Sequence, residues 1–236
     1  FPPRPFCLFG DFFGPGGGEF TPEDNCFNQP LDNITALNYE IGIKGQPFET
    51  LQMSLAAFYT EYEDLPYQVS TTQDGGFNTV NIIVDQDSSG IEWESSWAAF
   101  DGFFLNTSFG IMEVDVDAPD AEAPLTPDLT AAVGADYSMN LSVGGTLTFH
   151  ADYSYRDSMY GEPTADKGRN TEIDSRDLVS FDISYLSSDE NWLIGLYGKN
   201  ITDERYENAR LNTGDYIIVI QSNDASEFGV RAYYEF

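Results

Sequence analysis

The sequence is poor in basic residues, histidine and cysteine. It contains 10 lysines and arginines against 40 aspartates and glutamates, and its formal net charge is -30. A chain this acidic repels the phosphates of nucleic acids, which argues against nucleic-acid binding. The acidic surplus is typical of a solubilising surface in a salty habitat, and a specific cation-binding role is the alternative.

The sequence also lacks long hydrophobic runs. No stretch of about 18 consecutive apolar residues occurs, so the sequence offers no transmembrane helix. Hydrophobic residues still make up 41% of the chain and aromatic residues 15%, and they are dispersed in short alternating segments. This distribution favours a β-protein, either soluble or a transmembrane barrel.

The first residues, FPPRPFCLFG, lack a basic region, a small-residue cleavage site and an initiator Met. We therefore expect the chain to begin inside a longer protein. Residues 1–33 combine many glycines with many aromatics, which predicts a large irregular loop.

Cys7 and Cys26 are the only cysteines, and both lie in this first segment. A disulfide that closes the loop is the simplest reading, with a stabilisation of about 3 kcal/mol. It implies an oxidising compartment such as the periplasm or the cell exterior. A metal site is less favoured, because the single His150 is far away in sequence and two thiols do not complete a tetrahedral site.

The C-terminal stretch has the most regular alternation in the chain. Apolar residues Phe228, Val230, Ala232, Tyr234 and Phe236 alternate with Glu227, Gly229, Arg231, Tyr233 and Glu235. Chain ends are usually disordered, but this chain ends on an aromatic residue inside the alternation. About 10 such residues suffice for a tilted strand to cross a bilayer. The pattern predicts the closing strand of a transmembrane β-barrel.

Residues 34–236 repeat this alternation and predict an antiparallel, up-and-down barrel segment. Tight turns near residues 46, 100, 142 and 188 alternate with long polar connections at 63–78, 113–128 and 157–177, and a further long connection lies within 208–226. Alternating short and long connections indicate about nine strands, with the tight turns on the periplasmic side and the long loops outside.

A soluble β-sandwich would also show alternating strands. Here the apolar face carries Tyr, Trp and Phe near the strand ends, as in the aromatic girdles of membrane barrels. The other face carries charged residues of both signs, which a polar lumen permits: Glu40, Lys44, Glu92, Asp136, Asp152, Arg156, Asp182 and Arg231. We therefore favour an incomplete, all-β transmembrane barrel.

Three stretches carry a resemblance to a known family. The run NWLIGLYGKNITDERYENA is similar to the C-terminal signature of TonB-dependent outer-membrane receptors, in which a Trp-led strand runs into a Lys-Asn-Leu-Thr-Asp-x-x-Tyr motif. The stretches NYEIGIKGQPFETLQMSLAAFYTEYEDL and PLTPDLTAAVGADY resemble an earlier strand pair and the entry to a late strand of the same family. The matching motif residues are Trp192, Lys199, Asn200, Ile201, Thr202, Asp203 and Tyr206.

The resemblance implies a function and partners. It identifies the chain as the C-terminal part of a receptor in the bacterial outer membrane, with about 22 strands around a plug. Such receptors import a ferric siderophore, a cobalamin or an oligosaccharide with energy from the TonB complex. Outer-membrane lipid and the barrel-assembly machinery are further implied partners, with Tyr234 and Phe236 as the assembly signal. No cofactor is implied.

The sequence departs from the family pattern in two ways. No plug or energy-coupling box can be located in it. QSNDASEF stands where the family commonly has a Pro-Arg pair, which leaves the geometry of residues 208–226 open.

The loops supply candidate ligand contacts, namely Phe12, Phe13, Phe20 and Tyr160, although these aromatics are equally suited to packing the loops together. Five carboxylates between Glu113 and Glu122 could bind Ca²⁺, but their spacing matches no EF-hand, and a solvated charge run is favoured.

Two other function classes remain. A passive porin or structural barrel shares the strand pattern and the terminal Phe. A barrel enzyme would need a catalytic group, and the only imidazole, His150, lies two residues from Asp152 with no partnering nucleophile in the sequence. A polar pair facing the lumen is the favoured reading, so we expect no enzyme.

Overall fold

The computed structural model describes residues 33–73, 76–118, 121–163, 171–212, 216–222 and 224–235, and these ranges form strands, turns and loops without helices. Within them, no helix is long and apolar enough to span a membrane. The strands are β1 (Thr35–Phe48), β2 (Leu51–Gln73), β3 (Gly76–Phe100), β4 (Phe103–Val116), β5 (Leu129–Asn140), β6 (Thr146–Arg156), β7 (Met159–Tyr160), β8 (Glu172–Ile173), β9 (Arg176–Leu186), β10 (Trp192–Lys199), β11 (Glu207–Asn212), β12 (Ile217–Gln221) and β13 (Glu227–Tyr234).

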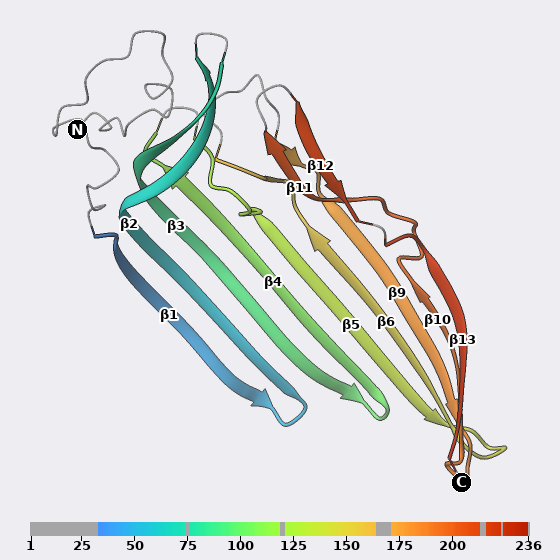
Figure 1. Cartoon of the computed structure of the whole chain (residues 1–236). Helices are drawn as coiled ribbons and strands as arrows, with labels where there is room; N and C mark the ends of the chain where they lie inside the picture. Colours follow the sequence, from blue (N-terminus) through green and yellow to red (C-terminus); the bar gives the residue numbers. More distant parts are fainter. Residues whose placement is uncertain are drawn as a thin grey trace, which may run out of the picture.

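Nine of these strands form one antiparallel sheet in the order β1-β2-β3-β4-β5-β6-β9-β10-β13 (Figure 1). The predicted all-β, up-and-down architecture with nine strands is confirmed. Strands β1 and β13 form the two edges, so the sheet is a curved wall and not a closed barrel. The short strands β7 with β8, and β11 with β12, make two separate hairpin sheets.

The register assigns each side chain to one of two faces, because residues directly opposite each other share a face. On one face, apolar side chains are exposed along the sheet. Ile41 is 77% exposed and Val230 is 74% exposed, although they lie at opposite edges of the wall. In water such exposure would be costly, whereas lipid tails cover it without penalty.

Aromatic rings gather on this face near the end where the chain terminates. Phe100 and Phe103 stack at 4.8 Å between ring centroids, and Tyr137 lies 6.1 Å from Phe100. This is the position of an interfacial aromatic belt.

The tight turns lie at one end of the sheet, together with the C-terminus (Figure 1). Gly102 has a φ of 75° in the β3–β4 turn, and Gly144 and Gly145 have φ of 97° and 85° in the β5–β6 turn. These left-handed conformations favour glycine, which explains why the chain reverses there in so few residues. The four predicted tight turns are confirmed.

The predicted loop at residues 63–78 is wrong, because β2 and β3 run through most of this stretch as a long hairpin. A bulge between Tyr62 and Leu65 inserts an extra residue and breaks the alternation. Pro66 lies beyond the last pair of β2 with β1, at Glu63, so its missing N–H falls on a free edge. A polar bulge followed by a proline therefore gave the appearance of a connection.

The long connection predicted at 113–128 also begins later than expected. Glu113 and Asp115 belong to β4, opposite Ser89 and Asp87 of β3. At 157–177 and 208–226, the outer connections contain the short strands β7, β8, β11 and β12. The sequence left the geometry of residues 208–226 open, and in the structure β11 and β12 pair there as antiparallel strands.

Buried residues are concentrated away from the middle of the wall. Ile173 is 0% exposed, and the other buried residues of the outer connections are Ala123, Thr171, Asn200 and Tyr206. A smaller cluster, centred on Tyr67 and Val84, lies where β2 and β3 extend past the sheet. Figure 1 shows β11 and β12 at the end opposite the tight turns. The described parts of the outer connections therefore bury side chains of their own.

Candidate functional site

The polar face of the sheet carries the charged residues that the alternation assigns to it. Asp136 is opposite His150, and His150 is opposite Asp182 on the next strand. Gly195 is opposite Arg231 at the last pair of strands. The polar face of β5, β6, β9, β10 and β13 is therefore one continuous surface.

Five residues on this surface form what we call the lumen cluster: Asp136, His150, Asp152, Asp182 and Arg231. His150 Nδ1 lies 2.8 Å from Asp136 Oδ1, and its Nε2 lies 3.4 Å from Asp152 Oδ1. Arg231 Nη2 donates to Asp182 Oδ1 at 2.7 Å. The cluster borders an open hollow of about 670 Å³ that Tyr197 and Lys199 also line.

The arrangement of His150 limits its chemistry. Both ring nitrogens face carboxylates, so neither is left to take a proton from a neighbouring hydroxyl. The prediction that His150 and Asp152 share a face is confirmed, and Asp136 is the closer partner. In the described part of the chain, no group of three or more His, Cys, Asp or Glu is arranged to hold a metal ion.

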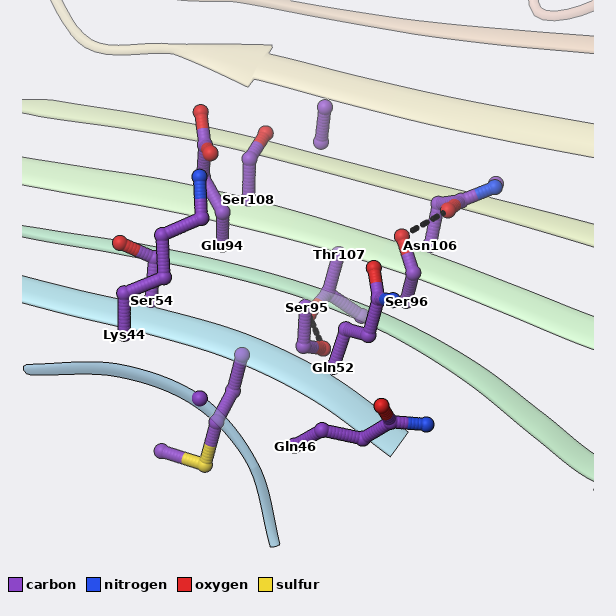
Figure 2. A pocket seen from close by; sticks show the side chains of 14 residues that line it. Lys44, Gln46, Gln52, Ser54, Glu94, Ser95, Ser96, Asn106, Thr107 and Ser108 are labelled. Carbon is purple, nitrogen blue, oxygen red and sulfur yellow. Dashed lines mark hydrogen bonds between the residues drawn. The ribbon is translucent and has the colours of Figure 1, made fainter. Parts of the chain in front are cut away.

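A second hollow, of about 600 Å³, lies on β1 to β5 (Figure 2). Its polar-face residues are mostly uncharged: Gln52, Ser54, Ser96, Asn106 and Ser108, with Lys44 and Glu94. Ser96 Oγ donates to Asn106 Oδ1 at 2.8 Å. Small residues such as Ala132 and Gly134 complete the lining. The second hollow is thus richer in hydroxyl and amide groups than the first.

A buried polar centre lies where β10 ends. Asn200 is 5% exposed and has a φ of 44°, a left-handed conformation that asparagine tolerates. Its Nδ2 donates to the carbonyl oxygens of Glu204 at 2.9 Å and Asp224 at 2.5 Å, and its Oδ1 accepts from the Glu204 N–H at 2.9 Å. One side chain therefore joins the start and the end of the β10–β13 connection.

Tyr206 completes this centre and is 8% exposed. Its hydroxyl donates to Asp224 Oδ2 at 2.6 Å, and the Arg176 guanidinium lies 4.4 Å from its ring centroid. Hydrogen bonds from the hydroxyls of Tyr206 and Ser222, together with the charge of Arg176, lower the pKa of Asp224. We call Asn200, Tyr206 and Asp224 the Asn200 cluster.

Comparison with known proteins identifies the fold family. A family model described as "TonB dependent receptor-like, beta-barrel" matches residues 4–201, which is most of the chain. The chain belongs to the TonB-dependent receptor family. No curated protein matches its sequence.

Solved TonB-dependent receptors and a metal transporter share the fold. The ferric yersiniabactin uptake receptor from Yersinia pestis is 16% identical with a TM-score of 0.66, over 86% of this chain and 30% of that one. The ferripyoverdine receptor of Pseudomonas aeruginosa is 18% identical with a TM-score of 0.65, over 89% and 28%. A copper transporter is 14% identical with a TM-score of 0.67, over 90% and 33%.

The chain thus spans about a third or less of the length of these proteins. Receptors of this family reside in the bacterial outer membrane. They are receptors and transporters, not enzymes.

The residues of the receptor motif take different positions in the structure. Trp192 begins β10 opposite Tyr234, whereas Lys199 ends β10 opposite Glu227. Thr202 Oγ1 lies 3.5 Å from Asn200 Oδ1, and Asp203 Oδ1 accepts from the Ser226 N–H at 3.2 Å. The second half of the motif therefore closes a connection, and these residues do not line either hollow except for Lys199.

The predicted ligand contacts lie apart from both hollows or outside the described part. Tyr160 is half-buried in β7, where its carbonyl oxygen accepts from the Leu125 N–H at 2.7 Å. Phe12, Phe13, Phe20, Cys7, Cys26 and Phe236 lie outside the described residues.

Sequence reasoning missed Arg176 and Asp224. Asp136 was expected on the lumen face, but its contact with His150 was not. The lumen partners follow from strand register, which the alternation alone does not fix between distant strands. Asp224 lies in the stretch where the family's Pro-Arg pair is absent, and that departure was the available signal.

Proposed function

We propose that the receptor to which this chain belongs imports a scarce nutrient across the outer membrane with energy from the TonB complex. Membership of the receptor family carries this proposal. A ferric siderophore is the favoured class, because the structural relatives include the ferric yersiniabactin and ferripyoverdine receptors. Copper, cobalamin and oligosaccharides are the other candidates.

In this proposal the chain contributes part of the barrel wall and its outer loops. The exposed apolar face binds outer-membrane lipid, and the polar face borders the path of the nutrient. Tyr160 contributes to ligand capture from the outer loops, together with Phe12, Phe13 and Phe20. A disulfide between Cys7 and Cys26 fixes the first of these loops.

Two further partners belong to this proposal. The TonB complex engages a plug that this sequence does not contain. Tyr234 and Phe236 form the signal that the barrel-assembly machinery reads. The lumen cluster supplies polar groups along the wall and no catalysis.

Energy-dependent uptake tests the proposal. The full-length receptor would be produced in a bacterium without its own iron receptors, and uptake of radioactive iron would be measured for a set of ferric siderophores. We expect uptake of at least one complex when TonB is present and none when TonB is deleted.

Equal uptake with and without TonB would support the passive porin instead. A copper-accumulation assay in the same two strains distinguishes the copper alternative. Failure of all substrates in both strains, with the receptor correctly inserted, would contradict import.

A further inference from the structure

The receptor motif ends in the Asn200 cluster, whose residues line neither hollow. Asn200 joins the two ends of the β10–β13 connection through the carbonyl oxygens of Glu204 and Asp224. The carbonyl oxygen of Tyr206 accepts from the Ser222 N–H at 3.0 Å, which closes the base of the β11–β12 hairpin. The hairpin therefore leaves the wall from a fixed base.

The cluster is also attached to β9. The Ile201 N–H donates to the Val179 carbonyl oxygen at 2.9 Å, and Arg176, the first residue of β9, lies over the Tyr206 ring. A loop attached only at its two ends would keep much of its conformational freedom. Here the contacts of Ile201 and Arg176 add a third attachment, to β9.

The hairpin contacts the neighbouring connection. The Asn212 N–H donates to Glu162 Oε2 at 3.1 Å. A Cβ at Gly161 would lie 2.5 Å from the Arg210 carbonyl oxygen, so the two backbones approach closely. Arg210 is held in turn by Glu207, which raises the pKa of the guanidinium.

The neighbouring connection contacts the next one along the wall. The Gly161 N–H donates to the Thr171 carbonyl oxygen at 2.9 Å, and the Leu125 N–H donates to the Tyr160 carbonyl oxygen at 2.7 Å. Pro124 and Tyr160 also form a parallel bridge. The contacts run without a break from the Asn200 cluster to Leu125, and Ile173 is fully buried among them.

We propose that Asn200, Tyr206 and Asp224 are positioning residues that hold the three described outer connections as one preassembled surface. Only the role of this surface in ligand capture rests on the proposed function. A surface ordered before the ligand arrives does not spend binding free energy on ordering loops. The motif at 199–206 therefore acts on the outer face of the receptor through structure and not through contact with the nutrient.

Amide hydrogen exchange on the ligand-free, full-length receptor tests this proposal without any knowledge of the nutrient. In the wild-type receptor we expect the amides of β11 and β12, Gly161 and Leu125 to be protected. Tyr206→Phe removes the hydroxyl that donates to Asp224. We expect exchange at all of these amides to become about tenfold faster, because the lost bond is to a charged acceptor.

Matched variants sharpen the test. Tyr39→Phe removes a hydroxyl from exposed β1 and should leave these rates within about twofold of wild type. Asp224→Asn keeps an oxygen acceptor for Tyr206 and should be the milder change, whereas Asp224→Ala should match Tyr206→Phe. If Asn200→Ala fails to assemble, the Tyr206 and Asp224 variants still decide the outcome.

Three results would overturn the proposal. The first is an absence of protection in the wild-type hairpin without ligand. The second is unchanged exchange in both Tyr206→Phe and Asp224→Ala. The third is acceleration confined to the hairpin, with Gly161 and Leu125 unaffected, because the connections would then move separately. None of these results depends on whether the receptor imports iron.

Discussion

Trp192 and Tyr234 face each other across β10 and β13, with ring centroids 4.7 Å apart and planes inclined by 43°. The pair joins the start of one strand to the end of the other at the periplasmic end of the wall. It is the last aromatic contact before the C-terminus in the described part of the chain.

Replacement of Trp192 by Ala should destabilise this end. We expect a loss of roughly 1–2 kcal/mol in the free energy of unfolding from lost apolar and ring contact. Trp192→Phe should lose less than half as much. Samples of the purified receptor would be incubated at increasing temperatures and then separated on a gel run in the cold. The measurement is the incubation temperature at which the band of the folded receptor disappears. Val143→Ala, at an exposed turn residue, is the control and should not shift it.

The Asp182 and Arg231 pair should behave as a coupled unit. Asp182 Oδ2 and Arg231 Nε are buried and lack hydrogen-bond partners within the described residues, so each side chain depends on its one contact. Because the Arg231 side chain is 38% exposed, solvent screens the pair, and Arg231→Gln should cost about 1 kcal/mol.

A double-mutant cycle measures this coupling. Asp182→Asn combined with Arg231→Gln should cost less than the sum of the two single changes, because neither charge is then left unpaired. Thermal unfolding in detergent is the readout. Additive losses would contradict the coupling.

Replacement of His150 by Gln should leave nutrient uptake within about twofold of wild type. Both nitrogens of the imidazole lie close to carboxylates, those of Asp136 and Asp152. Uptake rate at fixed receptor density is the measurement. A hydrolytic activity that is lost in His150→Gln would instead support the alternative that the protein is a barrel enzyme.

The Asn200 cluster should open only in acid. Contacts in the folded protein lower the pKa of Asp224, so the carboxylate favours the folded cluster. Its contribution to stability is complete above the unfolded pKa, about 4 for an aspartate, and is lost as pH falls through the lowered folded value.

Proteolysis of the β11–β12 hairpin on intact cells checks the sign of this dependence. With an acid-active protease, we expect no change between neutral pH and about 5, and faster cleavage only below about 4. Asp224→Asn should remove the contribution of this group to the pH dependence. Cleavage that becomes faster on raising the pH would contradict the assignment.

Gly102→Ala should impair the β3–β4 turn. Gly102 has a φ of 75°, and a Cβ there would lie 2.1 Å from the Ser138 carbonyl oxygen. We expect a cost of more than about 1 kcal/mol and a lower yield of assembled receptor. Gly134→Ala is the matched control, because a Cβ at that glycine meets nothing within 4 Å. Equal yields from the two variants would show that the turn is not under this constraint.

Alternation in the sequence was sufficient to predict the wall and its two faces. Phe228 and Val230 were assigned to the apolar face, and Asp182 and Arg231 to the polar one, because the alternation of side chains along a strand has a period of two. The turns were recognised from short polar segments. These features depend on residues close together in the chain.

Features that depend on distant residues could not be predicted in the same way. The bulge between Tyr62 and Leu65 shifts the register by one residue. Pro66 is tolerated because the pairing of β2 with β1 stops at Glu63. Asp224 contacts Tyr206 because the chain comes back to the end of β10 after the β11–β12 hairpin. No local sequence pattern predicts this contact. The family resemblance placed Asn200 and Tyr206 within a motif, but it did not indicate which contacts their side chains make.

The extension of β2 and β3 past their neighbours has a consequence for the outline of the receptor. From Asp64 to Gln73, β2 continues for 10 residues beyond its last pair with β1. At about 3.3 Å per residue this makes an arm of roughly 30 Å. It projects at the end away from the tight turns (Figure 1). The outline of the wall is therefore uneven, because the hairpin of β2 and β3 reaches further from the tight turns than the pairing of β1 with β2 does.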